Sequence, residues 1–210
     1  KQKKNDMTAF QKDKEYITNT YVMKCFNVSM CLYFITFILN VLDIFIVDKS
    51  IMLLGFVPSL IIYFAVSLIV GRISLSNTKI KYILLFFVVA VYTIIGVIIT
   101  YHAVLLAMLP ILYATLYASK RVMKYVYGLT VLSTMIVVYG GYYIGICDAN
   151  MALLTSTRLQ NYVVDGYFTQ TLVNSNPTIT LFLFFVVPRC LIYIAFMAVC
   201  TGIYRLIMNE

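Results

Sequence analysis

Asp43, His102 and Arg189 are the residues of this chain whose types and positions best suit a binding site. Each lies within or beside an apolar run long enough to cross a membrane. Ionisable groups at membrane depth are costly and usually face the protein interior or a water-filled cavity. The guanidinium of Arg189 offers a planar fork of donors that suits a carboxylate or a phosphate. Together with Tyr101, which adjoins His102, these residues predict an outward-facing ligand pocket.

The same residues also fit a purely structural role. Arg189 could pair with Asp43 or with backbone carbonyl groups, and His102 could be only a turn residue. The sequence leaves both interpretations open.

Residues for a catalytic or metal site are scarce. The chain has one histidine, eight acidic residues and no phosphate-binding glycine-rich loop or Ser-His-Asp pattern. Its five cysteines lack CxxC spacing, so we predict no zinc site and no disulfide framework. We therefore expect no catalytic residue, no metal and no cofactor.

Composition indicates a membrane protein. The chain is 62% hydrophobic, has a mean hydropathy of +0.93, and is only 11% charged, whereas soluble domains carry about 25% charged residues. A chain of this size cannot hide so much apolar surface in a water-soluble core, so lipid must solvate part of it. The net charge of +8 is best explained by a bias of cations toward the cytoplasmic ends of the spans, not by nucleic-acid binding.

Six apolar runs predict an all-α polytopic domain of six transmembrane helices over residues 21–207. The runs are Val22–Val47, Ile51–Val70, Tyr82 to the break at Thr100, Ala103–Ala118 with Pro110 in its middle, Val122–Ile146 and Thr178–Ile203. Residues 82–119 contain no Lys, Arg, Asp or Glu over 38 positions, which would make one helix of about 57 Å. A bilayer needs only about 20 residues, and cations flank both ends of the run. We therefore predict a hairpin that turns at residues 100–102.

The cations predict that both termini are cytoplasmic. Thirteen of the sixteen Lys and Arg residues fall at alternate breaks, the exceptions being Lys49, Arg158 and Arg189. Positive charge near span ends marks the cytoplasmic side. Residues 1–20 would then form a cytoplasmic segment with a short amphipathic helix, 147–178 would be an extracytoplasmic loop, and the protein would be multi-pass in the plasma membrane.

One stretch has a recognisable pattern. It is Tyr101-His102-Ala103-Val104-Leu105-Leu106-Ala107-Met108-Leu109-Pro110-Ile111-Leu112-Tyr113-Ala114-Thr115-Leu116-Tyr117-Ala118-Ser119-Lys120-Arg121. With its six-span order, the chain resembles the N-terminal membrane sensor region of bacterial GGDEF-type diguanylate cyclases and of related cyclases and histidine kinases. The resemblance implies that His102 and Pro110 belong to the sensor pocket, and it transfers no catalytic residue because the GGDEF motif is absent.

We therefore expect a sensory and dimerising input module of a bacterial signalling enzyme. A small-molecule ligand would bind in the outer half of a homodimer in the lipid bilayer, and the last helix would transmit the signal to an output domain beyond Glu210. The alternative is the substrate-binding membrane subunit of a vitamin-type transporter, a class that also has six spans in about 200 residues.

The topology can be tested with single cysteines in a cysteine-free background. On intact cells, an impermeant thiol reagent is expected to label Ser156→Cys and not Ser76→Cys, because the cation rule places position 76 inside. Labelling of position 76 alone would show that the orientation is the reverse of the predicted one.

Overall fold

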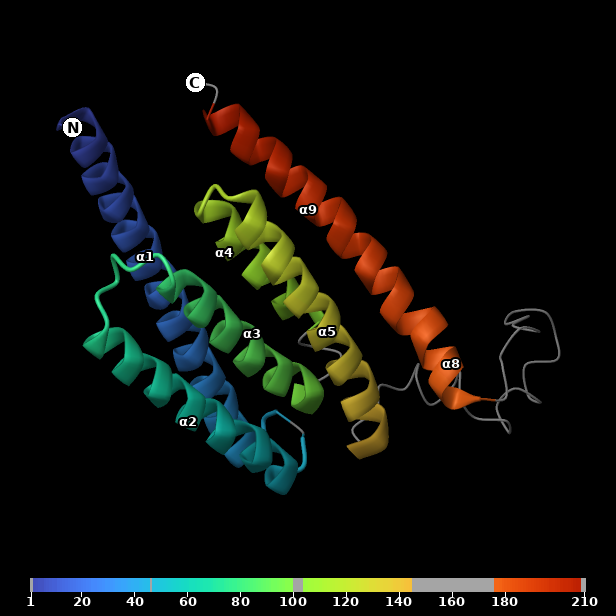
Figure 1. Cartoon of the computed structure of the whole chain (residues 1–210). Coiled ribbons are helices and arrows are strands. Elements are labelled where there is room, and N and C mark those ends of the chain that lie inside the picture. Colours follow the sequence, from blue (N-terminus) through green and yellow to red (C-terminus); the bar gives the residue numbers. More distant parts are fainter. Residues whose placement is uncertain (1, 46, 100–103, 145–175, 209–210) are drawn as a thin grey trace.

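The computed structural model describes residues 2–45, 47–99, 104–144 and 176–208, and within these ranges every regular element is a helix. The elements are α1 (Gln2–Val41), α2 (Lys49–Arg72), α3 (Ile80–Ile99), the 3₁₀ helix η1 (Val104–Met108), α4 (Leu109–Leu116), α5 (Lys120–Ile144), α8 (Pro177–Leu181), the π-helix η2 (Phe182–Val186) and α9 (Val187–Met208). Figure 1 shows them as a helical bundle. The predicted all-α class is confirmed.

Five segments are long and apolar enough to cross a membrane. They are Lys12–Val41, Lys49–Arg72, Ile80–Ile99, Lys120–Tyr143 and Pro177–Arg205. This is the architecture of a polytopic membrane protein. Within residues 82–119 the described parts form α3 on one side and η1 with α4 on the other, which pack together as predicted; the predicted turn at 100–102 lies outside the described residues.

The fourth predicted span is shorter than expected. Its apolar helix covers only Leu105–Leu116, about 18 Å of rise, against a bilayer core of about 30 Å. Pro110 does not lie in the middle of a regular helix but in the first turn of α4. Proline lacks the N–H group and crowds the carbonyl four residues earlier, which accounts for the 3₁₀ geometry of η1 and the start of α4 at this point.

The observed first helix also differs from the predicted span Val22–Val47 at both ends. α1 runs without a break from Gln2, so the described part of the predicted 1–20 segment is helical and continues directly into the first span. It ends at Val41 instead of Val47, because Asp43 takes a positive φ of 59° and the Asn40 amide donates to the Phe45 and Val47 carbonyls at 2.8 and 2.7 Å. Aspartate is among the residues that tolerate this backbone region. The side chain of Asn40 therefore stabilises a turn where the sequence suggested more helix.

α3 lies at the centre of the bundle and the last helix at its edge (Figure 1). In the most apolar window of each span, 61% of the residues are buried in α3 and only 11% in Pro177–Arg205. Small residues let neighbouring helices approach α3 closely. A Cβ added to Gly55 of α2 would lie 2.4 Å from Ile98, and one added to Gly96 would lie 2.8 Å from Val137 of α5.

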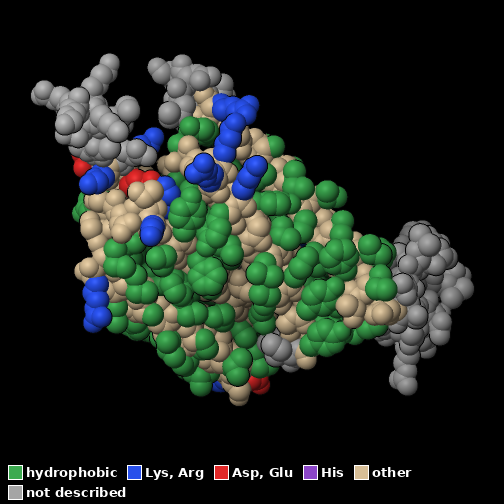
Figure 2. Space-filling view, in the orientation of Figure 1, with side chains coloured by type: hydrophobic (Ala, Val, Ile, Leu, Met, Phe, Trp, Pro, Cys, Tyr) green, Lys and Arg blue, Asp and Glu red, His purple; other side chains and the backbone are tan. Residues whose placement is uncertain are grey.

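Lys and Arg side chains gather at one end of the molecule, where α1 begins and α9 ends (Figure 2). We call this the basic end. The exposed cations at the helix ends that meet there are Lys12 and Lys14 of α1, Arg72 and Lys79 around the α2–α3 turn, Lys120, Arg121 and Lys124 at the start of α5, and Arg205 near the end of α9. Hydrophobic side chains cover most of the middle of the face shown in Figure 2. The clustering of cations at one end agrees with the charge alternation read from the sequence.

A buried polar cluster joins α1 to α3 and to the α4–α5 turn at the basic end. Lys81 Nζ lies 2.5 Å from Glu15 Oε1, and their side chains are only 9% and 11% exposed. The Tyr117 hydroxyl donates to Asn19 Oδ1 at 2.7 Å, and Asn19 Nδ2 donates to the Leu75 carbonyl at 2.6 Å. Burial, and then the nearby Glu15 carboxylate, raise the pKa of Tyr117. The phenol therefore stays protonated and remains a donor.

Removing one partner of this ion pair is expected to destabilise the protein. Lys81→Met leaves the Glu15 charge buried and unpaired, a loss of about 3–5 kcal/mol for such pairs. The thermal midpoint of the purified protein in detergent should fall sharply. Lys79→Met is the control, because Lys79 is exposed, and Glu15→Gln combined with Lys81→Met should recover part of the loss. A midpoint for Lys81→Met equal to that of Lys79→Met would contradict this assignment.

Candidate functional site: a hydroxyl-lined core beside Arg189

Arg189 lies near the middle of one long helical segment. α8, η2 and α9 follow one another without interruption from Pro177 to Met208. The π-helix η2 immediately precedes Pro188, and the N–H group of Val187 donates to the Phe182 carbonyl five residues earlier. This wider turn accommodates the proline ring, which would otherwise crowd the preceding turn. Sequence and local geometry thus place Arg189 just after a distortion of the helix.

The residues around Arg189 border a small cavity. The cavity measures about 20 Å³ and is lined by Tyr92, Gly96, Ala107, Ser133, Thr134, Val137, Arg189 and Tyr193. These residues come from α3, η1, α5 and α9. A cavity of this size suits about one water molecule, so a larger ligand could enter only if α9 moved away from α5.

Hydroxyl groups form most of the polar lining. Thr93 donates to Ser133 at 2.7 Å between α3 and α5. The Tyr92 hydroxyl lies 2.8 Å from that of Ser29 and 3.3 Å from that of Tyr113.

The hydrogen bond between α5 and α9 is longer than those within the core. Thr134 donates to Tyr193 at 3.4 Å, whereas hydroxyl–hydroxyl bonds are usually about 2.7–2.8 Å. The bonds Thr93–Ser133 and Tyr92–Ser29 in the core are therefore tighter than the Thr134–Tyr193 bond to α9. The start of the same segment is held to α5 more closely, because the hydroxyl groups of Tyr139 and Tyr143 each lie 3.0 Å from Thr178.

The Arg189 guanidinium has no ion pair or hydrogen bond to any residue that the structure describes. Its nearest recorded partner is the Phe185 ring, whose centroid lies 5.7 Å from Cζ. An aromatic face offers a cation only about 0.5–2 kcal/mol. A half-buried guanidinium at this depth therefore has free donors that an anionic group could use.

Of the other predicted site residues, those that the structure describes do not join Arg189. Asp43 is exposed in the turn after α1, where Lys49 Nζ lies 2.9 Å from its Oδ1; the predicted pairing of Asp43 with Arg189 is wrong, because α1 ends before Asp43. Pro110 is buried but does not line the small cavity. Tyr101 and His102 lie outside the described residues.

Sequence reasoning missed the hydroxyl groups of Ser133 and Thr134, which line the cavity, and that of Thr93, which donates to Ser133 beside it. Thr93, Ser133 and Thr134 are buried polar residues within apolar spans, and their position in such runs was the available signal. Tyr193 also lines the cavity; it is 2% exposed and lies one helical turn after Arg189.

Comparison with known proteins adds no further assignment. The chain matches no protein-family model, no curated protein and no solved structure.

Replacement of Arg189 by glutamine is expected to leave the protein folded. No described ion pair or hydrogen bond is lost, only the contact with the Phe185 ring, and a charge at the centre of a membrane helix costs about 3 kcal/mol. The thermal midpoint in detergent should stay the same or rise, in contrast to the loss expected for Lys81→Met. A large fall in the midpoint would show that Arg189 has a structural partner.

Proposed function

We propose that this chain is a membrane input module that binds a small anionic ligand at Arg189 and responds by a shift of the last helix. The observation that carries the proposal is a guanidinium that has no ion pair or hydrogen bond to any described residue and lies on the span with the least buried apolar window. The proposal includes the orientation with both termini in the cytoplasm and a location in the plasma membrane.

The geometry offers a physical route for the response. The cavity beside Arg189 is too small for an organic anion, so binding requires a different packing of α9 against α5. A ligand shifts such an equilibrium only by its differential affinity for the two packings. The long Thr134–Tyr193 hydrogen bond and the π-helix η2 are the features that make this displacement less costly than a movement of α3. The shift would reach the basic end along α9.

The ligand proposal can be tested by thermal stability of the full chain in detergent. Acetate, succinate, citrate, inorganic phosphate and pyrophosphate serve as probes, at matched ionic strength. A bound anion at one hundred times its dissociation constant stabilises the folded state by about 2.7 kcal/mol. We expect at least one probe to raise the midpoint of the wild type and not that of Arg189→Gln. Arg189→Lys should recover little of the effect, because an ammonium group cannot replace the planar fork.

Two results would contradict this assignment. If the same anion stabilised Arg189→Gln equally, the anion would bind elsewhere. If none of the probes stabilised the wild type, recognition of these carboxylates and phosphates by Arg189 would be excluded.

A separate measurement distinguishes signalling from transport. A coding sequence that continues after Glu210 into a coiled coil and a cyclase or kinase domain would support the input module, and cross-linking between Ile203→Cys residues of two copies would support the proposed homodimer. A stop codon within a few residues, with uptake of the stabilising anion into proteoliposomes, would favour the transporter subunit.

A further inference from the structure

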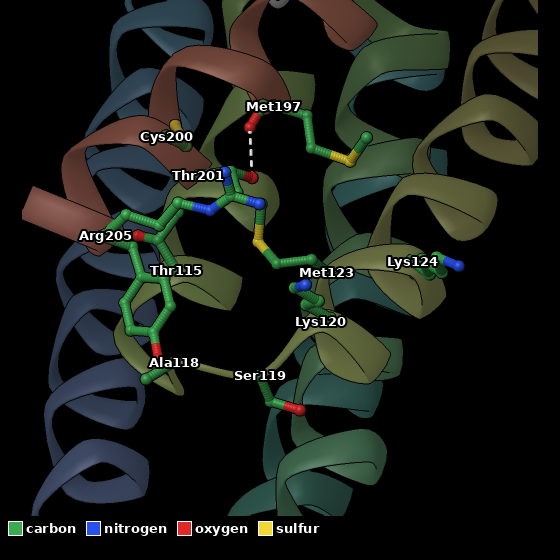
Figure 3. Close-up of a pocket in the computed structure, with 11 residues that line it drawn as sticks. Thr115, Ala118, Ser119, Lys120, Met123, Lys124, Met197, Cys200, Thr201 and Arg205 are labelled. Carbon is green, nitrogen blue, oxygen red and sulfur yellow. Dashed lines mark hydrogen bonds between the residues drawn. The ribbon is translucent and has the colours of Figure 1, made fainter. Parts of the chain in front are cut away.

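A second site lies at the basic end, far along α9 from Arg189. A cavity of about 240 Å³ opens between the α4–α5 turn, the first turn of α5 and the last turns of α9. Its walls include Met123, Met197, Cys200 and Tyr204. Figure 3 shows Arg205 extending toward Met123 and Lys120, while the amino group of Lys124 points outward at the edge.

An adjoining cavity extends this space along α9. It measures about 290 Å³ and is lined by Leu112, Leu116 and Ile203, with Lys14 of α1 at its boundary. The two cavities share Thr115, Ala118, Cys200 and Tyr204. Together they form an apolar space between α4 and α9 that is large enough for part of an acyl chain.

The cations around this space are not neutralised within the described chain. Lys120, Lys124 and Arg205 line the first cavity and Lys14 the second. Among the described residues, ion pairs are formed only by Lys49 with Asp43 and by Lys81 with Glu15. The positive end of the α5 dipole adds to the same field, since α5 begins at Lys120.

We propose that this double cavity binds an anionic phospholipid from the leaflet at the basic end. Basic pockets between transmembrane helices on the cytoplasmic side are suited to acidic lipid headgroups. The mostly apolar walls would accept an acyl chain, and the flexible methionine side chains can adapt to its shape. A free phosphate ion would use the cations but leave the apolar walls without a partner. The proposal does not depend on ligand binding at Arg189.

Native mass spectrometry of the purified full chain tests the proposal. The probes are dioleoyl phosphatidylglycerol and dioleoyl phosphatidylcholine, which share their acyl chains, and inorganic phosphate. We expect the phosphatidylglycerol to bind most tightly. The triple variant Lys120→Gln, Lys124→Gln, Arg205→Gln should weaken its binding on the order of 10- to 100-fold. The matched control is Arg72→Gln, Lys79→Gln, Arg121→Gln, which removes the same charge at the same end outside both cavities.

A second pair of variants tests the apolar part and does not change the charge. Thr201 lines the first cavity, so Thr201→Leu should obstruct it and weaken phosphatidylglycerol binding. Gly202 has no neighbouring atom within 4 Å of an added Cβ, so Gly202→Leu should bind as the wild type does. If the triple variant does not fold, this pair decides the question.

Three outcomes would overturn the proposal. Equal weakening in both triple variants would mean diffuse attraction to surface charge. Equal binding of the two phospholipids would exclude recognition of the headgroup charge. Binding of inorganic phosphate as tight as that of the lipid, with no effect of Thr201→Leu, would mean a site for a free anion.

Discussion

The buried contact between Glu15 and Lys81 is the interaction on which the arrangement of this bundle depends most. In a bilayer, apolar side chains gain little by leaving lipid for one another, so association relies on close packing and on polar contacts between helices. Here an ion pair and the hydrogen bonds of Asn19 with Tyr117 and Leu75 fix the rotation of α1 against α3 and the α4–α5 turn. Each of these groups would be costly if its partner turned away.

α3 occupies the centre because it provides both close packing and polar contacts to its neighbouring helices. The missing side chain of Gly96 lets α5 approach α3 closely, and that of Gly55 in α2 leaves room for Ile98 of α3. The helices therefore pack closely on two sides of α3. Its Thr93 supplies a hydroxyl that bonds to α5. These contacts leave few degrees of freedom to the helices around α3. The last helical segment is different, because only 11% of its apolar window is buried. Its start is held to α5 by the hydroxyl groups of Tyr139 and Tyr143, each 3.0 Å from Thr178, but beyond Arg189 its hydrogen bond to α5 is long.

Two positively charged features therefore lie along the helix that is least restrained. Arg189 faces a small hydroxyl-lined cavity near the middle of the segment, and Arg205 stands beside a larger apolar cavity at the basic end. We propose a small anion for the first and an anionic amphiphile for the second, because only the second combines charge with extended apolar walls. A ligand at either place would act on the packing of α9, and the two effects would be coupled through that helix.

The sequence alone determined the helical class, the positions of most spans and the hairpin within residues 82–119. These follow from the length of an apolar run and the charges at its ends, which are local properties of the chain. The partners of the polar residues were decided by the tertiary structure. Glu15 meets Lys81 across 66 positions, and Asp43 faces Lys49 instead of Arg189 because Asn40 stabilises a turn there. Which side chains meet depends on the rotation and the termination of each helix, and these are set by contacts with other parts of the bundle that no single segment contains.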